Sequence, residues 1–272
     1  MNIDGPLLLV GCGKMGGALL AGWLEGGLEP QKVTIVEPSA ELRQSYESKG
    51  ANAVADAQDL PDDLEPSVVL LAVKPQVMAD VLPPYRRFVT PETVFVSIAA
   101  GKTIAFFEDH LGEDAAIVRT IPNTPAAVGR GITGMAANAR VGEAQKKAAA
   151  DLLSAVGETV WLDDESLIDV VTAVSGSGPA YVFYLIECLA AAGAEAGLPE
   201  DQAMRFARSV VCGAGELAYR DDTTAGQLRK NVTSPGGTTQ AALDVLMADD
   251  GLEALMNRAV AAAAERSREL AD

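Results

Sequence analysis

The chain has 272 residues, of which 49% are hydrophobic and 22% are charged, a composition typical of a globular protein with one large or two moderate domains. Its formal net charge of −17 argues against a nucleic-acid partner, because phosphate backbones are bound by clusters of Lys and Arg. Three scattered cysteines and a single histidine, His110, support neither a disulfide framework nor a zinc site, so no metal is expected.

The first part of the chain alternates apolar runs with helical stretches. The runs lie at 7–10, 33–36, 68–73, 94–98, 116–119 and, more weakly, 134–136. Buried runs separated by helices are typical of a parallel sheet covered on both faces. We therefore predict an α/β fold, with a Rossmann-type doubly wound parallel sheet forming a dinucleotide-binding domain over residues 1–160. The run Leu7–Val10 is too short for a signal or a membrane span, so we expect no membrane partner and a cytoplasmic location.

The pattern changes near Trp161. From Leu167 to Ala271 we find no strand, only Ala-rich helical segments, and this predicts an all-α dimerisation and substrate domain over residues 161–272. The segment 180–196 is apolar around most of its circumference but is interrupted by Glu187 and Glu195, so it is too polar to span a membrane. Burial between subunits is the natural solution, and we expect a homo-oligomer.

The turn after the first run has the glycine spacing of a dinucleotide site. Gly11, Gly13 and Gly16 follow a predicted strand and open a predicted helix, and Lys14 and Met15 lie between them. Gly11 permits the tight turn, Gly13 lets a pyrophosphate approach, and Gly16 lets the helix pack close to the strand. A bound NADPH or NADH is expected here.

Glu37 ends the next predicted strand, where the adenosine ribose should lie. A carboxylate accepts hydrogen bonds from a free 2′-hydroxyl and repels a 2′-phosphate, so Glu37 alone favours NADH. If Pro38 turns the carboxylate away, Ser39 could serve a phosphate instead, and a solvated Glu37 is an equal alternative. The preference between NADPH and NADH therefore stays open.

Two dehydrogenase classes are disfavoured. His110 follows Phe106-Phe107-Glu108-Asp109 at a predicted helix end with an acidic solvated face, which argues against histidine-dependent hydroxy-acid dehydrogenases. The β-hydroxyacid dehydrogenases need a lysine on the first long helix of their second half, and no lysine lies between Lys147 and Lys230.

With these two classes disfavoured, the sequence resembles the pyrroline-5-carboxylate reductase family over essentially the whole chain. The stretches that carry the resemblance are Val10–Gly16, Ala72–Pro75, Ser97–Gly101, Pro122–Pro125, Val174–Tyr181 and Ser234–Thr239. The last two are the most specific, since dinucleotide binding explains neither. The resemblance implies helical domains that interleave in a dimer, five dimers in a decamer, and an active site between one subunit's cofactor and the partner's helices.

The matched stretches supply further candidate residues. Those that follow strand ends, where a doubly wound sheet presents its ligand crevice, are expected to contact the cofactor: Val73, Lys74, Pro75, Ala99, Ala100, Gly101 and Asn123. Ser175 and Ser177 should break the helical path and bring backbone close to the ligand. A solvated Lys74, a merely rigid turn at Asn123 and an interdomain hinge at Ser175 to Pro179 are the plainer alternatives.

The loop Ser234–Thr239 is the candidate substrate site. Free N–H groups at Gly237, Thr238 and Thr239 would hold a carboxylate at a helix N-terminus without any arginine. By resemblance, the Thr239 hydroxyl meets the ring nitrogen, with Ser175 as a further catalytic candidate and Ser234, Ser177 and Thr238 as substrate contacts. A pure helix cap is the alternative for this loop.

We therefore expect hydride transfer from NADPH or NADH to the cyclic imine 1-pyrroline-5-carboxylate, giving proline in the last step of proline biosynthesis. Two rival functions stay open. One is reduction of a different cyclic imine or of a cofactor-like hydride acceptor, and the other is a dinucleotide-sensing or scaffold protein without turnover. The number of dimers, feedback by proline and the source of the imine proton are not predicted.

Overall fold

The computed structural model describes residues 5–270, and it divides into two compact units. The first unit holds the residues up to Gly176 together with those from Ala264 onward, and the second holds 177–263. This division differs from the sequence-based boundary after residue 160. The reason is packing: Ile168, in the segment that follows residue 160, is buried against Ile121 and Ala136 of the first unit.

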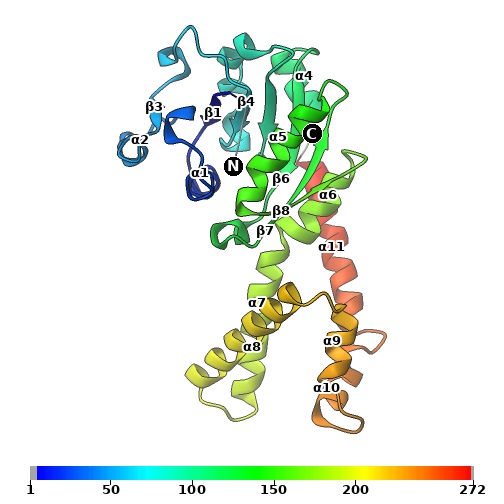
Figure 1. Ribbon diagram of the computed structural model, residues 1–272. Coiled ribbons are helices and arrows are strands. Elements are labelled where there is room, and N and C mark those ends of the chain that lie inside the picture. Colours follow the sequence, from blue (N-terminus) through cyan, green and yellow to red (C-terminus); the bar gives the residue numbers. More distant parts are fainter. Residues whose placement is uncertain (1–4, 271–272) are drawn as a thin grey trace. The chain divides into compact units, whose positions relative to one another are not determined.

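The first unit is built on one eight-stranded sheet with the order β3-β2-β1-β4-β5-β6-β7-β8 (Figure 1). Strands β1 to β6 are parallel, as predicted. Strand β7 runs antiparallel to β6, which the prediction of a parallel sheet missed; a short connection returns the chain directly beside β6, and only antiparallel neighbours can be joined that way. The strands are β1 (Leu7–Val10), β2 (Val33–Val36), β3 (Asn52–Val54), β4 (Val68–Leu71), β5 (Val94–Ser97), β6 (Ala116–Ile121), β7 (Gly131–Ala137) and β8 (Gly157–Trp161).

Strands β3 and β8 were not predicted. Both lie at the edges of the sheet, and neither contains a fully buried residue. An edge strand needs no continuous apolar run, so its sequence carries little signal.

Helices cover both faces of the sheet, as the term doubly wound requires. Side chains alternate along each strand, so Leu7 and Leu9 face one helical layer while Leu8 and Val10 face the other. The first layer contains α1 (Lys14–Glu25) and α5 (Glu143–Leu153), and the Trp23 indole N–H of α1 donates to the Leu152 carbonyl of α5 at 2.7 Å. The second layer contains α3 (Met78–Val81), η4 (Pro83–Phe88) and α4 (Ile104–Leu111).

The helices have the following bounds. The α-helices of the first unit are α1 (Lys14–Glu25), α2 (Ala40–Glu47), α3 (Met78–Val81), α4 (Ile104–Leu111), α5 (Glu143–Leu153) and α6 (Leu167–Val171). The short helices are η1 (Pro30–Lys32), η2 (Ala57–Asp59), η3 (Pro75–Val77), η4 (Pro83–Phe88), η5 (Thr124–Val128), η6 (Ser154–Val156) and the π-helix η7 (Thr172–Gly176). The remaining helices are α7 (Gly178–Glu195), α8 (Glu200–Arg220), α9 (Ala225–Asn231), α10 (Thr238–Leu246) and α11 (Leu252–Glu269), and the boundary between the units falls within α11.

The second unit contains only helices among its residues, which confirms the helical prediction for this part of the chain; the predicted end at Ala271 lies outside the described residues. Helices α7 and α8 pack against each other as an antiparallel pair (Figure 1). Within residues 5–270, no helix is both long enough and apolar enough to cross a membrane.

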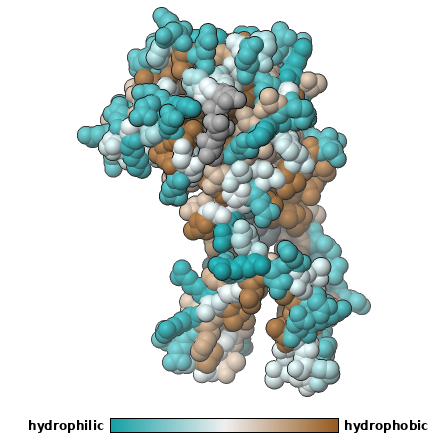
Figure 2. All heavy atoms as spheres, viewed as in Figure 1, coloured by the Kyte–Doolittle hydropathy of each residue, from teal (hydrophilic) through white to brown (hydrophobic). Residues whose placement is uncertain are grey.

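Large apolar side chains stand exposed on this helical pair. Phe183 of α7 is 60% exposed and Phe206 of α8 is 62% exposed, and Figure 2 shows apolar surface on the helices of this unit. Apolar surface of this extent usually marks a protein–protein interface, in keeping with a helical domain that pairs with a second copy.

Candidate functional site

Two of the three glycines in the turn after β1 are required by the packing of the protein itself. Gly11 has a φ of +84°, and a Cβ there would lie 2.9 Å from Cγ1 of Val73. A Cβ on Gly16 would lie 2.6 Å from the Gly11 carbonyl oxygen, so only glycine lets α1 start so close to β1. The structure thus brings Gly11, Gly16 and Val73 together, as expected for this kind of turn.

Gly13 differs from the other two, since a Cβ there would meet nothing within 4 Å. The protein itself leaves this space open. Gly13 is the N-cap of α1, and no side chain caps that helix. The N–H groups of Lys14, Met15 and Gly16, in the first turn of α1, lack intrahelical acceptors as in any helix. An exposed Gly13 beside an uncapped helix N-terminus fits a pyrophosphate, so the residues present suit the predicted dinucleotide.

Glu37 lies beside this turn and is only 8% exposed. Its carboxylate accepts the Cys12 N–H at 2.8 Å and the Ser39 N–H at 2.9 Å. A carboxylate offers about four acceptor positions, so two remain for ribose hydroxyls. Pro38 therefore does not turn the carboxylate into solvent, and of the two sequence-based alternatives the solvated Glu37 is wrong.

Ser39 and Arg43 complete this end of the site. The Ser39 hydroxyl caps α2 by accepting the Leu42 N–H at 3.4 Å. Sequence reasoning missed Arg43, whose Nη1 donates to the carbonyls of Glu37 at 2.7 Å and Pro38 at 2.8 Å. These bonds hold the Arg43 guanidinium on the backbone carbonyls of Glu37 and Pro38. The signal was available, because Arg43 follows the cap residue Ser39 by one helical turn.

Cys12, inside the glycine turn, is buried, and burial raises the pKa of its thiol to about 11, although a hydrogen bond with Tyr46 lowers it in part. Burial likewise raises the pKa of the Tyr46 hydroxyl. Both groups stay protonated at neutral pH. Cys12 therefore packs as a small apolar residue and is not a nucleophile.

The residues after β4 and β5 lie at the carboxyl edge of the sheet. Lys74 is exposed, Pro75 is half-buried at the start of η3, Ala99 is buried and Ala100 is exposed. Gly101 is explained differently from the sequence-based reading, because a Cβ there would lie 2.9 Å from the Leu270 carbonyl oxygen. Its small size makes room for the Leu270 carbonyl, so the protein's own packing requires glycine here.

Asn123 follows β6 and is 8% exposed. Its Oδ1 accepts the Ile132 N–H at 3.0 Å. Its Nδ2 donates to Ser175, at 3.1 Å to Oγ and 3.3 Å to the carbonyl oxygen. Ser175 lies on the π-helix η7, the break that the sequence predicted, and the structure thus joins two candidate residues that are far apart in sequence.

The loop before α10 lies in the second unit, as does Ser177. Pro235 and Gly236, whose φ is +70°, occupy the middle of a turn in which the Gly237 N–H donates to the Ser234 carbonyl at 3.0 Å. The expectation of a free N–H at Gly237 is therefore wrong. Thr238 and Thr239 remain, because they begin α10, whose N-cap Gly237 provides no side-chain cap. Thr239 is half-buried and Thr238 is exposed.

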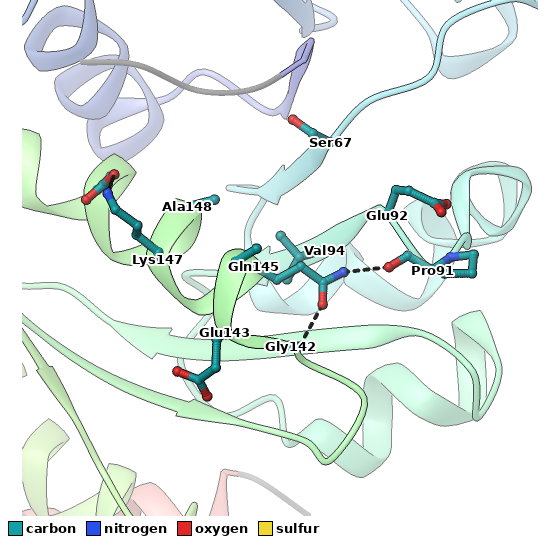
Figure 3. Close-up of a pocket in the computed structure, with 11 residues that line it drawn as sticks. Ser67, Pro91, Glu92, Val94, Gly142, Glu143, Gln145, Lys147 and Ala148 are labelled. Carbon is teal, nitrogen blue, oxygen red and sulfur yellow. Dashed lines mark hydrogen bonds and ion pairs between the residues drawn. The ribbon is translucent and has the colours of Figure 1, made fainter.

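A broad pocket elsewhere does not belong to this site. Its lining includes Ser67, Val94, Glu92 and Lys147, and Gln145 bridges it by donating to the Pro91 carbonyl (Figure 3). Val94 is the first residue of β5, so the pocket lies at the amino ends of the strands. Ligands of open α/β sheets bind at the carboxyl ends.

Comparisons with known proteins agree with both halves of this description. Residues 7–101 match the family model described as NADP oxidoreductase coenzyme F420-dependent, and residues 165–270 match that described as pyrroline-5-carboxylate reductase dimerisation. The chain is 41% identical to a pyrroline-5-carboxylate reductase of Pseudomonas aeruginosa, over 98% of this chain and 97% of the relative. It is 36% identical to one of Glycine max, over 96% of this chain and 94% of the relative.

Two solved structures resemble the whole chain. A pyrroline-5-carboxylate reductase of Coxiella burnetii superposes with a TM-score of 0.93 at 33% identity, covering 99% of this chain and 100% of the other. A pyrroline carboxylate reductase of Plasmodium falciparum with NADP bound superposes with a TM-score of 0.81 at 28% identity, covering 99% of each chain.

Proposed function

The chain belongs to the pyrroline-5-carboxylate reductase family, and we propose that it reduces 1-pyrroline-5-carboxylate to proline with NADPH or NADH, the last step of proline biosynthesis. The observation that carries the proposal is the loop 234–239. It opens α10 without a side-chain cap and places a half-buried hydroxyl, Thr239, in the first turn. Dinucleotide binding requires none of this, which supports assigning the loop to a second ligand, the substrate.

We assign the cofactor to the first unit, within the proposed dinucleotide-binding domain of residues 1–160. The first turn of α1 would hold the pyrophosphate, and the two open acceptor positions of Glu37 would hold the ribose. Val73, Lys74, Pro75, Ala99 and Ala100 would border the nicotinamide, which supplies the hydride when bound. The small size of Ala99 and Ala100 leaves room for a ring at this edge.

We assign the substrate to residues 161–272, the proposed helical dimerisation and substrate domain. The Thr238 and Thr239 N–H groups, at the positive end of the α10 dipole, suit the substrate carboxylate. The Thr239 hydroxyl would meet the ring nitrogen, and Ser175 is the further catalytic candidate. A neutral cyclic imine becomes electrophilic when its nitrogen is protonated, so a hydroxyl positioned at that nitrogen, together with solvent, suffices without a strongly basic residue.

We further propose that the protein is a homodimer in which the exposed apolar faces of α7 and α8 are covered by a second copy, and that five dimers form a decamer as the family resemblance implies. We place it in the cytoplasm, where reduced cysteines persist. Cys12, Cys188 and Cys212 are free thiols.

Steady-state oxidation of NADPH and NADH by the purified chain tests the function. We expect turnover with pyrroline-5-carboxylate and much slower turnover with its six-membered analogue. Equal rates on the two imines would make the substrate assignment wrong, and no oxidation with either imine would favour a non-catalytic dinucleotide-binding protein.

A further inference from the structure

We propose that Asn123 is a positioning residue that keeps the Ser175 hydroxyl free to donate a hydrogen bond to the imine substrate. The inference rests on the proposed function and goes beyond it, since it gives Asn123 a role through Ser175 in place of a direct contact with the cofactor. It starts from the three hydrogen bonds that the Asn123 carboxamide makes.

The orientation of that carboxamide follows from its partners. The backbone N–H of Ile132 can only donate, so the atom 3.0 Å from it must be the oxygen Oδ1. The nitrogen Nδ2 then faces Ser175, where the carbonyl oxygen at 3.3 Å can only accept. A rotated amide would place N–H against N–H and oxygen against oxygen. The partners of Oδ1 and of Nδ2 therefore require the same orientation of the carboxamide.

This orientation decides what the Ser175 hydroxyl can do. Nδ2 has no acceptor capacity, so at 3.1 Å the Ser175 Oγ must accept from it. A serine hydroxyl has one hydrogen, and it cannot point toward a donor. The Ser175 hydrogen is thus directed away from Asn123 and is available to an acceptor such as an imine nitrogen or a carboxylate oxygen.

The backbone around Ser175 is held in a conformation that serves this arrangement. Residues 172–176 form a π-helix, a rare element that is frequent at functional sites. The Thr172 hydroxyl donates to the Ile168 carbonyl at 2.8 Å, one turn before. A Cβ on Gly134 would lie 2.8 Å from Cγ1 of Val171, so β7 approaches this segment closely. Together with the Asn123 hydrogen bonds to Ser175, these contacts hold the end of α6 and the π-helix in place.

Two observations favour the substrate over the cofactor as the acceptor. Ser175 lies within residues 165–270, which match the reductase dimerisation model, and outside residues 7–101, which match the dinucleotide oxidoreductase model. Ser175 also borders a hollow whose other lining residues carry no polar side chain: Ile132, Gly134, Val160, Leu162, Val170, Val171 and Val174.

The test uses Asn123→Asp, which keeps the shape of the side chain. One carboxylate oxygen still accepts the Ile132 N–H, but the other now accepts the Ser175 O–H and removes it from the substrate. We expect kcat/KM for the imine to fall by about 10- to 100-fold, the loss of one strong hydrogen bond in the transition state, with a similar fall in Ser175→Ala. Because both changes remove the same donor, the double variant should be no more than about 3-fold worse than either single variant. The dissociation constant of NADH should stay nearly unchanged.

Asn138→Asp is the matched control. The Asn138 carboxamide has a similar pattern near the other end of β6, with Oδ1 accepting the Ile117 N–H at 3.1 Å, while Nδ2 donates to the Ala115 carbonyl and to the Glu108 carboxylate, each at 2.9 Å. This variant should lose thermal stability but keep its kcat/KM. If Asn123→Asp does not fold, Asn123→Ala takes its place in the same cycle.

Near-wild-type kcat/KM in the Asn123 variant, or losses that multiply in the double variant, would overturn the proposal. A raised NADH dissociation constant would return Asn123 to the cofactor. Wild-type protein that fails to reduce the imine would overturn the proposed function separately. Proline affinity of the NADH complex would then decide the inference: lower affinity in both single variants supports it, and unchanged affinity overturns it.

Discussion

Glu37 gives the sharpest test of how this protein selects its cofactor. The proposed change is Glu37→Gln, which preserves the size of a side chain that is 8% exposed. It removes the negative charge beside the adenosine ribose and replaces one acceptor oxygen with an NH2 group. Either the Cys12 N–H or the Ser39 N–H then loses its partner, at present 2.8 and 2.9 Å away.

General energetics of charges and hydrogen bonds give both expected magnitudes. Two like unit charges 4 Å apart repel by about 4 kcal/mol at an effective dielectric constant near 20. The repulsion between the Glu37 carboxylate and a mobile, solvated 2′-phosphate would be a fraction of this value. Removing about 1.4 kcal/mol of this repulsion raises kcat/KM tenfold. The ratio of kcat/KM for NADPH to that for NADH should therefore rise at least ~10-fold. The lost charge-assisted hydrogen bond should cost about 1.5–3 kcal/mol of unfolding free energy, seen as a lower Tm.

The assay measures kcat/KM with both cofactors at saturating imine, together with Tm, on the wild type and two variants. Glu41→Gln is the control, because Glu41 is an exposed carboxylate in the first turn of α2. It should change neither quantity by much. A lower Tm with an unchanged cofactor ratio in Glu37→Gln would refute the reasoning, and Glu37 would then only brace the glycine turn.

Three further predictions concern other parts of the molecule. Thr239→Ala should lower kcat/KM for the imine by about 10²-fold. NADH affinity should be nearly unchanged, and the loss of unfolding free energy should be only ~1 kcal/mol. Near-wild-type kinetics would show that Thr239 has only a structural role at the start of α10. Light scattering at micromolar concentration should give at least a dimeric mass, and Phe183→Glu on the exposed face of α7 should shift it toward monomer; a monomeric wild type would contradict the shared helical interface. Cys12, with a thiol pKa near 11, should be alkylated at pH 8 about 100-fold more slowly than a free thiol, even before burial is counted. Since this pKa lies above the unfolded value of 9.0, the thiol's contribution to stability should fall as pH rises from 9 toward 11, and a thermal-melt series of wild type against Cys12→Ala would check the sign.

The parts of the fold that sequence alone determined are those governed by local rules. The central parallel strands are continuous apolar runs, because both of their faces are buried, and the glycine turn requires residues without a Cβ. The helical second half follows from its lack of β-branched runs. The edge strands β3 and β8 were missed for the opposite reason, since exposed edges leave almost no pattern.

Only the tertiary structure decided what the candidate side chains contact. Sequence placed Glu37 near a ribose but could not tell a buried carboxylate holding two backbone N–H groups from a solvated one. It gave Gly237 a free N–H that the Ser234 carbonyl takes, and it explained Gly101 by a ligand where the chain's own Leu270 carbonyl approaches. It could not pair Asn123 with Ser175, 52 positions apart. Hydrogen bonds between distant segments depend on orientation to within fractions of an ångström, which only the packed fold sets.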